Sequence, residues 1–318
     1  MAKGGNPMQI RKSRSRSGLR RGNTMALWLI ALPGILYLLI NNYLPMAGLF
    51  LAFKNYSFAK GIWGSPWNGV KNFRFLFVSN DAWIITRNTI FYNFGFIVLG
   101  TVVSVFFAIL LFELGNSFRT KFYQSALLFP HLISWVVSSY LVYALLNPTT
   151  GFVNHVIMPL FGSDGIDWYT SPGYWPAILT ITYLWKHAGY NAIVYMASIS
   201  GIDKGIFEAA EIDGASKVQQ IFRITLPMLR PTITIMVLMA VGRVFYSDFG
   251  LFYQIPMDSG QLYGVTQTID TYVYRGLMQN ANVSLSAAAG FYQSICGFLL
   301  VMGANQLVRI FDRDNALF

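Results

Sequence analysis

The stretch GIDKGIFEAAEIDGASKVQQIFRITLPMLRP, Gly201 to Pro231, is a polar segment between two long apolar runs. Its first half carries the signals of a short helix. Asp203 is a residue type that caps helix N-termini through its side-chain oxygen, and Gly214 supplies the permissive backbone that ends a helix. A bend at Gly214 is therefore expected in the middle of the segment.

The second half of the segment carries the signals of another short helix. Ser216 is followed three residues later by Gln219, which is the spacing of a capping box at a helix start. Pro227 and Pro231 lack a backbone N–H, so they are expected to break this helix and restart the chain. An ordinary interfacial loop between two membrane helices would show the same signals.

The composition indicates a membrane protein. Of the 318 residues, 54% are hydrophobic and only 11% are charged, and the mean hydropathy is +0.46. A soluble domain carries about 25% charged residues. The net charge of +10 could indicate nucleic-acid binding, but much of it lies in a basic, Ser- and Gly-rich tail at residues 1–24. Because no base-reading domain follows, we expect this tail to face cytoplasm and anionic lipid, and we expect no nucleic-acid partner.

Long apolar runs predict an all-α, polytopic membrane protein. Each run after the first has about 24–26 residues, enough to cross about 30 Å of hydrocarbon with some tilt. The first run is expected to bend near Pro33 or Pro45, and segment 54–87 to form an external loop that lies partly at the interface. The transmembrane domain 25–318 is expected to hold six spanning helices, at about residues 25–53, 88–112, 122–146, 175–200, 231–254 and 285–310.

The distribution of Lys and Arg predicts the orientation. With the N-terminus inside, the cytoplasmic segments hold 15 of the 23 basic residues and the external segments hold six. Both termini and the loop 201–230 are therefore expected in the cytoplasm. The external segment 54–87 is richer in Lys and Arg than this rule prefers.

The polar segment matches a spaced pattern. Glu208-Ala209-Ala210 is followed after three residues by Gly214, and after nine more by Ile224-x-Leu226-Pro227. This pattern resembles the EAA loop of ATP-binding-cassette (ABC) importer permeases. The chain from about Leu27 to the end is similar to the carbohydrate branch of that family. The stretch SDFGLFYQIPMDSGQLYGVTQTIDTYVYRGL, Ser247 to Leu277, looks like the subgroup that imports plant- or alga-derived oligosaccharides.

The resemblance implies a type I ABC-importer permease fold and a transport function, not an enzyme. It implies alternating access in the cytoplasmic membrane, with a second permease chain, two cytoplasmic ATPase subunits and an extracytoplasmic sugar-binding protein as partners. ATP and Mg would bind to the ATPase chains. The loop expected to dock on an ATPase subunit contains Glu208, Ala209, Ala210, Asp213, Gly214, Ala215, Ile224, Leu226 and Pro227.

Two cations fall near the middle of predicted spans. Lys186 is the twelfth residue of the run from Trp175, and Arg243 the thirteenth of the run from Pro231. A charge at the centre of a spanning helix costs roughly 2.5–3.5 kcal/mol on insertion scales. One explanation is pairing with an acid such as Asp248 or with the second subunit. The other is that both cations line the pathway and attract an acidic, uronate-containing oligosaccharide.

A sugar pathway needs aromatic platforms with polar side chains nearby. The predicted spans supply such pairs, although aromatic residues are also common in helix packing. The candidate pathway residues are Tyr92, Asn93, Tyr183, Trp185, Lys186, Tyr190, Asn191, Arg243, Tyr246, Asp248, Phe249 and Phe252.

Several motifs are missing from the sequence. It has no G-x-x-x-x-G-K-[ST] phosphate loop, so we expect this chain to bind no ATP by itself. It has no G-x-S-x-G or H-E-x-x-H motif, and its histidines lack ligand spacing, so neither an enzyme nor a metal site is expected. A permease for a peptide, amino acid or polyamine is the main alternative, and a membrane enzyme or a non-transporting scaffold is a further one.

Overall fold

The computed structural model describes residues 21–115, 117–163 and 165–311. The regular secondary structure of this part of the chain is helical apart from one isolated antiparallel bridge between Lys54 and Trp67, which confirms the all-α prediction. The chain divides into two compact units, Met1–Leu49 and Phe50–Phe318. Most of the predicted basic tail, residues 1–20, lies outside the described residues, as do residues 312–318 of the predicted transmembrane domain.

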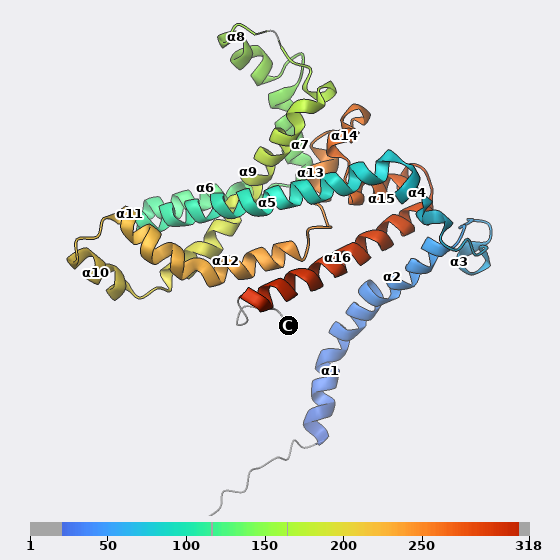
Figure 1. Ribbon diagram of the computed structural model, residues 1–318, viewed down its shortest axis with the longest axis horizontal. Helices are drawn as coiled ribbons and strands as arrows, with labels where there is room; N and C mark the ends of the chain where they lie inside the picture. Colours follow the sequence, from blue (N-terminus) through green and yellow to red (C-terminus); the bar gives the residue numbers. More distant parts are fainter. Residues whose placement is uncertain (1–20, 116, 164, 312–318) are drawn as a thin grey trace, which may run out of the picture. The chain divides into compact units, whose positions relative to one another are not determined.

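Figure 1 shows the helices in their chain order. The longer ones are α1 Arg21–Leu38, α5 Asn80–Glu113, α6 Phe118–Leu132, α7 Trp135–Leu146, α9 Trp175–Ser200, α10 Lys204–Ile212, α12 Leu226–Val241, α15 Ile269–Met278 and α16 Val283–Phe311. The shorter ones are α2 Leu44–Met46, α3 Gly61–Gly64, α4 Phe75–Val78, α8 Met158–Leu160, α11 Lys217–Gln220, α13 Phe249–Gln254 and α14 Tyr263–Thr266. The 3₁₀ turns are Ala47–Phe53, Lys71–Arg74, Trp168–Thr170, Pro172–Tyr174 and Gly260–Leu262.

Each π-helical segment of the described chain ends two residues before a proline. The segments are Leu39–Tyr43, Val153–Ile157 and Ile221–Thr225, and the prolines are Pro45, Pro159 and Pro227. In each case the residue just before the proline donates its N–H to the carbonyl five residues back. A proline has no N–H to donate and crowds the carbonyl four residues back, and the wider π turn lets the helix continue past it.

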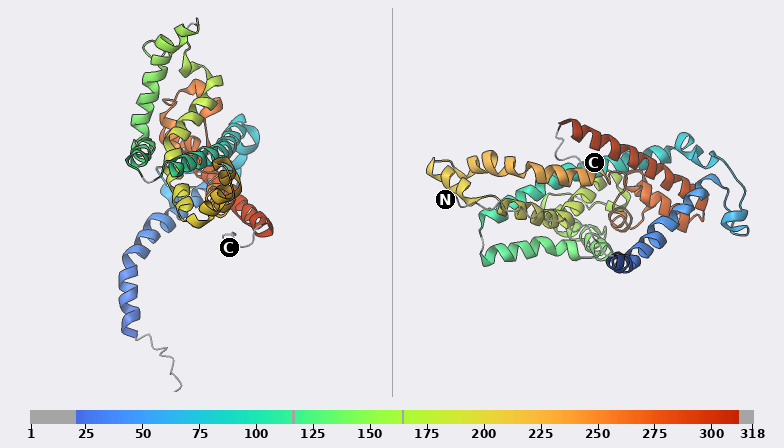
Figure 2. Two further views of the ribbon diagram at one scale, coloured as in Figure 1. Left: turned by 90° about the vertical axis from the view of Figure 1, so that its left-hand side faces the viewer. Right: turned by 90° about the horizontal axis from the view of Figure 1, so that it is seen from below.

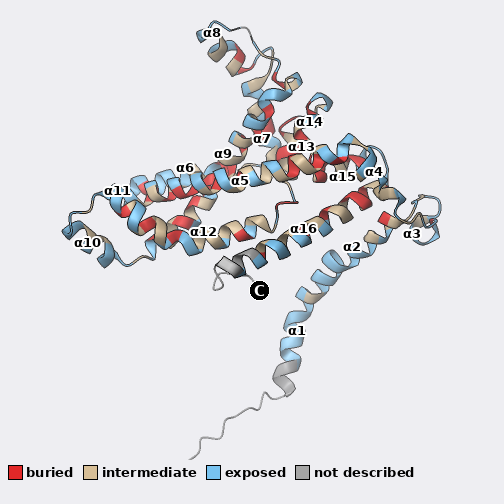
Figure 3. Ribbon diagram, in the orientation of Figure 1, coloured by how far each residue is buried: buried red, intermediate tan, exposed pale blue. Residues whose placement is uncertain are grey.

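The predicted breaks at Pro227 and Pro231 are therefore wrong. Helical backbone continues from Lys217 to Val241, with Pro227 at the start of α12 and Pro231 inside it. In the first unit, helical backbone likewise runs through Pro33 and changes to a π turn just ahead of Pro45. In Figure 3 the described part of this unit is mostly exposed, and its large side chains are apolar.

Helix α5 is the axis of the second unit. It packs along α9, and its two ends meet different elements. Its first half contacts α4, α14 and α15, whereas Phe112 near its end packs on Phe207 of α10, with ring centroids 5.9 Å apart. Figures 1 and 2 accordingly show α10 and α11 at the end of this unit away from α13–α15.

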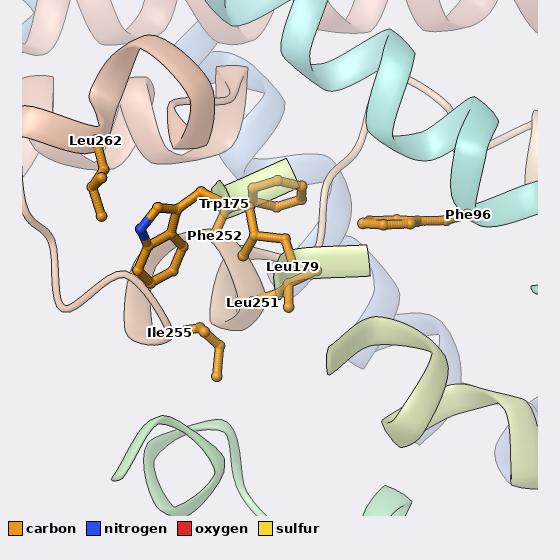
Figure 4. Packing of buried hydrophobic residues seen from close by; sticks show 7 residues of the cluster. All are labelled: Phe96, Trp175, Leu179, Leu251, Phe252, Ile255 and Leu262. Carbon is orange, nitrogen blue, oxygen red and sulfur yellow. The ribbon is translucent and has the colours of Figure 1, made fainter. Parts of the chain in front are cut away.

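The main apolar core of the second unit joins α5 and α9 to the segment that follows α12. Trp175 and Leu179 of α9 and Phe252 of α13 are fully buried together with Phe96 of α5. Figure 4 shows this cluster, which also contains Leu251, Ile255 and Leu262. The core therefore attaches the stretch Ser247–Leu277 to the central helix pair.

By length and composition, four helical segments of the described chain can cross a membrane. They are Met25–Phe53, Asn80–Glu113, Lys217–Val241 and Val283–Gln306. The pair α6 and α7 provides a fifth if it is one broken span, because the two helices meet at an angle of 98°. Helix α9 has 26 residues, long enough to cross about 30 Å, but its polar side chains exclude it from this set. Six spans are compatible with these findings.

Two predicted spans differ from the observed helices. The run 122–146 is divided at the elbow between α6 and α7, where Ser134 caps α7. The run 231–254 extends beyond the end of the observed helix, because α12 ends at Val241 and Asp248 caps the separate helix α13. Both differences arise because an apolar run contains a capping residue, which an average over the run does not detect.

Candidate functional site

The loop with the EAA-type pattern is built by caps that the sequence predicts. Asp203 Oδ1 accepts a hydrogen bond from Gly205 N at 3.0 Å and so caps α10. Gly214 has a φ of +78°, a left-handed conformation that favours glycine, and it turns the chain between α10 and α11. Ser216 and Gln219 form the expected capping box at the start of α11.

An ion pair closes the bend. Lys217 Nζ lies 2.5 Å from Glu211 Oε1, and both side chains are exposed. The hydrogen bond from Lys217 holds the pKa of the Glu211 carboxyl below its ordinary value. The bend between α10 and α11 is therefore fixed by a left-handed glycine, a capping box and one exposed ion pair.

The outer surface of this loop is available for contact. Glu208, Ala209, Asp213 and Gly214 are exposed, whereas Ala210, Ala215, Ile224, Leu226 and Pro227 are partly buried. The Glu208 and Asp213 carboxylates make no side-chain hydrogen bond or ion pair to any described residue. The neighbouring surface is apolar, and Ile212 is 87% exposed beside the exposed side chains of Val218 and Phe222. Isolated carboxylates next to exposed large apolar side chains are typical of a surface that meets another protein.

The candidate pathway residues converge only in part. A cavity of about 420 Å³ lies between α5, α6, α9 and the end of α12. It contains Tyr183, Tyr190, Asn191 and Arg243 from the predicted set. Tyr183 is stacked on Phe96, with ring centroids 3.9 Å apart, and this pair forms part of the cavity wall.

Arg243 has a different position from the one predicted. It lies just beyond the C-terminus of α12 and not inside a helix. Its side chain is exposed, lines the cavity, and makes no hydrogen bond or ion pair to any described residue. None of the described residues that line this cavity is an Asp or a Glu.

Lys186 has partners that the sequence analysis did not anticipate. It is only 4% exposed, and its ammonium group donates to the carbonyl oxygens of Pro130, at 3.2 Å, and of Ile133. The ammonium nitrogen also lies 4.8 Å from the ring centroid of Trp135. Helix α6 ends at this point, so these carbonyls are among those that a helix C-terminus leaves unsatisfied. Lys186 thus stabilises the elbow between α6 and α7 and does not line the cavity.

His187 takes the partner expected for Lys186. Its Nε2 lies 3.4 Å from Asp248 Oδ2, and the other carboxylate oxygen of Asp248 accepts from the backbone at the start of α13. The His187 ring also lies near Tyr183, at 4.6 Å between centroids, and near His131, at 5.6 Å. His131 in turn stacks on Tyr190, at 4.5 Å. Both histidines line the cavity.

The remaining candidates serve packing or line other surfaces. Tyr92 donates its hydroxyl to the Val265 carbonyl at 2.8 Å, and Asn93 donates to the Val244 carbonyl at 2.9 Å. Trp185 lines a separate apolar groove of about 960 Å³ between α5, α6 and α9. None of the other three lines the cavity: Phe252 is in the core, Phe249 stacks on Tyr253, and Tyr246 is exposed.

Sequence analysis missed the two histidines of the cavity. They lie far apart in the chain and come together only because α6 and α9 pack closely. A Cβ on Gly189 of α9 would lie 1.9 Å from the carbonyl oxygen of Leu127 in α6, so the helix contact depends on this glycine. The sequence of α9 does not identify its partner helix, so no local signal could have found this pair.

These features define a helical membrane transport component: apolar spanning helices around a central cavity, and an exposed bent loop at one end of them. The chain belongs to the family of binding-protein-dependent transport system inner membrane components, whose model matches residues 24–314. It is therefore the permease subunit of an ABC importer and not itself an enzyme.

Known relatives cover nearly the whole chain. The polygalacturonan/rhamnogalacturonan transport system permease protein YteP of Bacillus subtilis is 31% identical over 91% of this chain and 89% of its own length. The sn-glycerol-3-phosphate transport system permease protein UgpA of Salmonella typhimurium is 26% identical over 75% of this chain and 77% of its own length.

A solved structure has the same fold. It is a bacterial ABC transporter involved in the import of the acidic polysaccharide alginate, and one of its chains matches with a TM-score of 0.83 and 30% identity. The match covers 92% of this chain and 97% of that one. A second structure, with a TM-score of 0.82, holds the alginate transporter in complex with an alginate pentasaccharide-bound periplasmic protein.

Proposed function

We propose that this permease imports oligosaccharides, including acidic, uronate-containing ones, by alternating access. The observation that carries the proposal is the cavity between α5, α6, α9 and α12. It offers aromatic faces from Tyr183 and Tyr190, an amide from Asn191 and a cation from Arg243. Sugar rings stack on aromatic faces, while their hydroxyl and carboxylate groups accept hydrogen bonds from such donors. The relatives that act on polygalacturonan and alginate support the same substrate class.

The loop from Glu208 to Pro227 would receive the force of ATP hydrolysis. The exposed carboxylates of Glu208 and Asp213, next to exposed apolar side chains such as Ile212, suit docking on an ATPase subunit. From the loop, α11 leads without a break into α12, whose end borders the cavity at Arg243. A displacement of the loop would therefore reach the cavity along one continuous helical segment.

The partners follow from the family and from charge. The family description supports an extracytoplasmic binding protein that delivers the sugar. We infer a second permease chain and two ATPase subunits, with ATP and Mg bound on the ATPase chains. The excess of Lys and Arg on the side of the loop supports a multi-pass topology in the cytoplasmic membrane with both termini and the loop inside.

Purification and reconstitution test this proposal. The tagged chain should copurify with an ATPase and a second permease, and the assembly in proteoliposomes should accumulate a galacturonate oligosaccharide when ATP and the binding protein are present. Accumulation of a peptide, an amino acid or a polyamine, with none of the oligosaccharide, would favour the non-sugar alternative. A reagent that labels a cysteine at position 213 only from outside would contradict the topology.

A further inference from the structure

The cavity contains an uncompensated positive charge. The side chain of Arg243 lines it without a hydrogen bond or ion pair to any described residue, and no carboxylate is present among the described lining residues. A charged side chain inside the membrane costs free energy unless it faces water or a partner of opposite charge. The positive charge of Arg243 therefore makes the cavity complementary to an anionic ligand.

Three other basic side chains lie near the cavity: Lys186, His187 and His131. Lys186 donates to the carbonyls of Pro130 and Ile133, and it is buried behind the elbow. His187 lies against Asp248 at 3.4 Å. His131 is stacked on Tyr190, with the ring planes inclined by 13°, and its Nδ1 has no hydrogen-bond partner among the described residues. Among the described residues that line the cavity, Arg243 is thus the permanently charged side chain, and it shares the lining with the stacked rings of His131 and Tyr190.

We propose that Arg243 is the residue that selects acidic over neutral sugars, by binding a uronate carboxylate while the sugar ring lies against the aromatic rings that line the same cavity. A guanidinium group presents parallel N–H donors that match the two oxygens of a carboxylate, so one contact fixes both charge and orientation. Asp248 is not among the described residues that line the cavity, and its Oδ2 lies 3.4 Å from His187 Nε2. This inference rests on the proposed function, since it assigns the charge selectivity of that same cavity.

The test compares two ligands that differ only in charge. Binding of a galacturonate trisaccharide and of its methyl ester is measured on the purified permease–ATPase assembly without the binding protein, so that delivery does not affect the result. The wild-type assembly should prefer the free acid, and Arg243→Gln should weaken binding of the acid by about tenfold or more, since hydrogen bonds to charged groups are the strong ones. Binding of the ester should change by less than about twofold.

Two further variants separate the roles of the cations. Arg243→Lys keeps the charge but loses the paired donors, so the preference for the acid should fall only in part. Lys186→Gln should lower the thermal stability of the assembly and leave the ratio of acid to ester binding unchanged.

The outcomes separate the two proposals. If the wild-type assembly binds neither ligand, the proposed sugar function fails. If it binds both and Arg243→Gln weakens them equally, or leaves the preference unchanged, the sugar function stands and the role of Arg243 is overturned. If neither Arg243 variant assembles with the second permease, Arg243 pairs with that subunit, which also overturns the inference.

Discussion

Replacing Lys186 with methionine tests the role of the elbow between α6 and α7. The substitution keeps an unbranched side chain, one atom shorter, and removes the ammonium group with its charge. The Ile133 carbonyl loses its donor, and the Pro130 carbonyl keeps only the backbone N–H of Ile133, at 3.3 Å. The contact with the Trp135 ring is lost as well. The elbow, with its 98° angle, should therefore become less stable.

The magnitude follows from opposing contributions. Two hydrogen bonds from a charged donor contribute about 1.5–3 kcal/mol each, and a buried cation–π contact adds about 1–2 kcal/mol. Removing a charge from the middle of the spans recovers about 2.5–3.5 kcal/mol. The net effect of Lys186→Met is therefore a destabilisation of about 0.5–5.5 kcal/mol, with a central value of about 3 kcal/mol.

Thermal unfolding of the purified assembly measures this effect. We expect the Tm of Lys186→Met to fall by at least about 3 °C. Lys204→Met is the matched control, because Lys204 is exposed on α10 and its side chain makes no hydrogen bond or ion pair to a described residue. Its Tm should stay within about 1 °C of wild type. An unchanged or higher Tm for Lys186→Met would show that the buried ammonium group does not stabilise the elbow.

Three further predictions concern glycines and caps. Gly214→Val places a β-branched residue at a φ of +78°, at a cost of at least about 1–2 kcal/mol, and should straighten the bend and uncouple ATP hydrolysis from transport. The control Gly205→Ala, whose new Cβ makes only an ordinary contact at 3.5 Å, should leave coupling unchanged. Normal coupling in Gly214→Val would refute the role of the loop. Gly189→Ala puts a Cβ 1.9 Å from a backbone oxygen of α6 and should destabilise the assembly by about 1–3 kcal/mol or more. The control Gly95→Ala, whose Cβ meets nothing within 4 Å, should leave the Tm unchanged. Equal Tm values for the two variants would contradict the close contact between α6 and α9. Ser216→Ala removes the cap of α11 and should cost about 1 kcal/mol, seen as faster hydrogen exchange at the bend, and unchanged exchange would argue against the cap.

Local signals in the sequence predict the loop well. The Asp203 cap, the bend at Gly214 and the Ser216–Gln219 capping box each depend on residues within a few positions of one another. Such features need no distant partner, so the chain specifies them wherever it folds. The prolines are the exception. Pro227 and Pro231 predict breaks, but tertiary packing keeps the helix continuous, and a π turn absorbs the missing hydrogen bond.

The candidate pathway is predicted less well, because the chemistry of a side chain does not say which neighbour it meets. Tyr92 and Phe252 are residue types that sugar-binding sites use, yet here they stabilise the core. Lys186 and His187 are adjacent in sequence, but helix geometry turns one towards the elbow and the other towards Asp248. Only the position relative to α6 and α13 separates these two roles.

By itself, the sequence determines that this is an all-helical membrane permease with a bent polar loop between apolar runs, because apolar length, capping residues and motif spacing are properties of contiguous chain. The tertiary structure alone decides which charges are satisfied and which remain open to a ligand. Lys186 and Arg243 look equivalent along the chain, and the packing of α6 against α9 buries the first and leaves the second in the cavity. The physical reason is that burial and electrostatic pairing depend on contacts between segments far apart in the sequence.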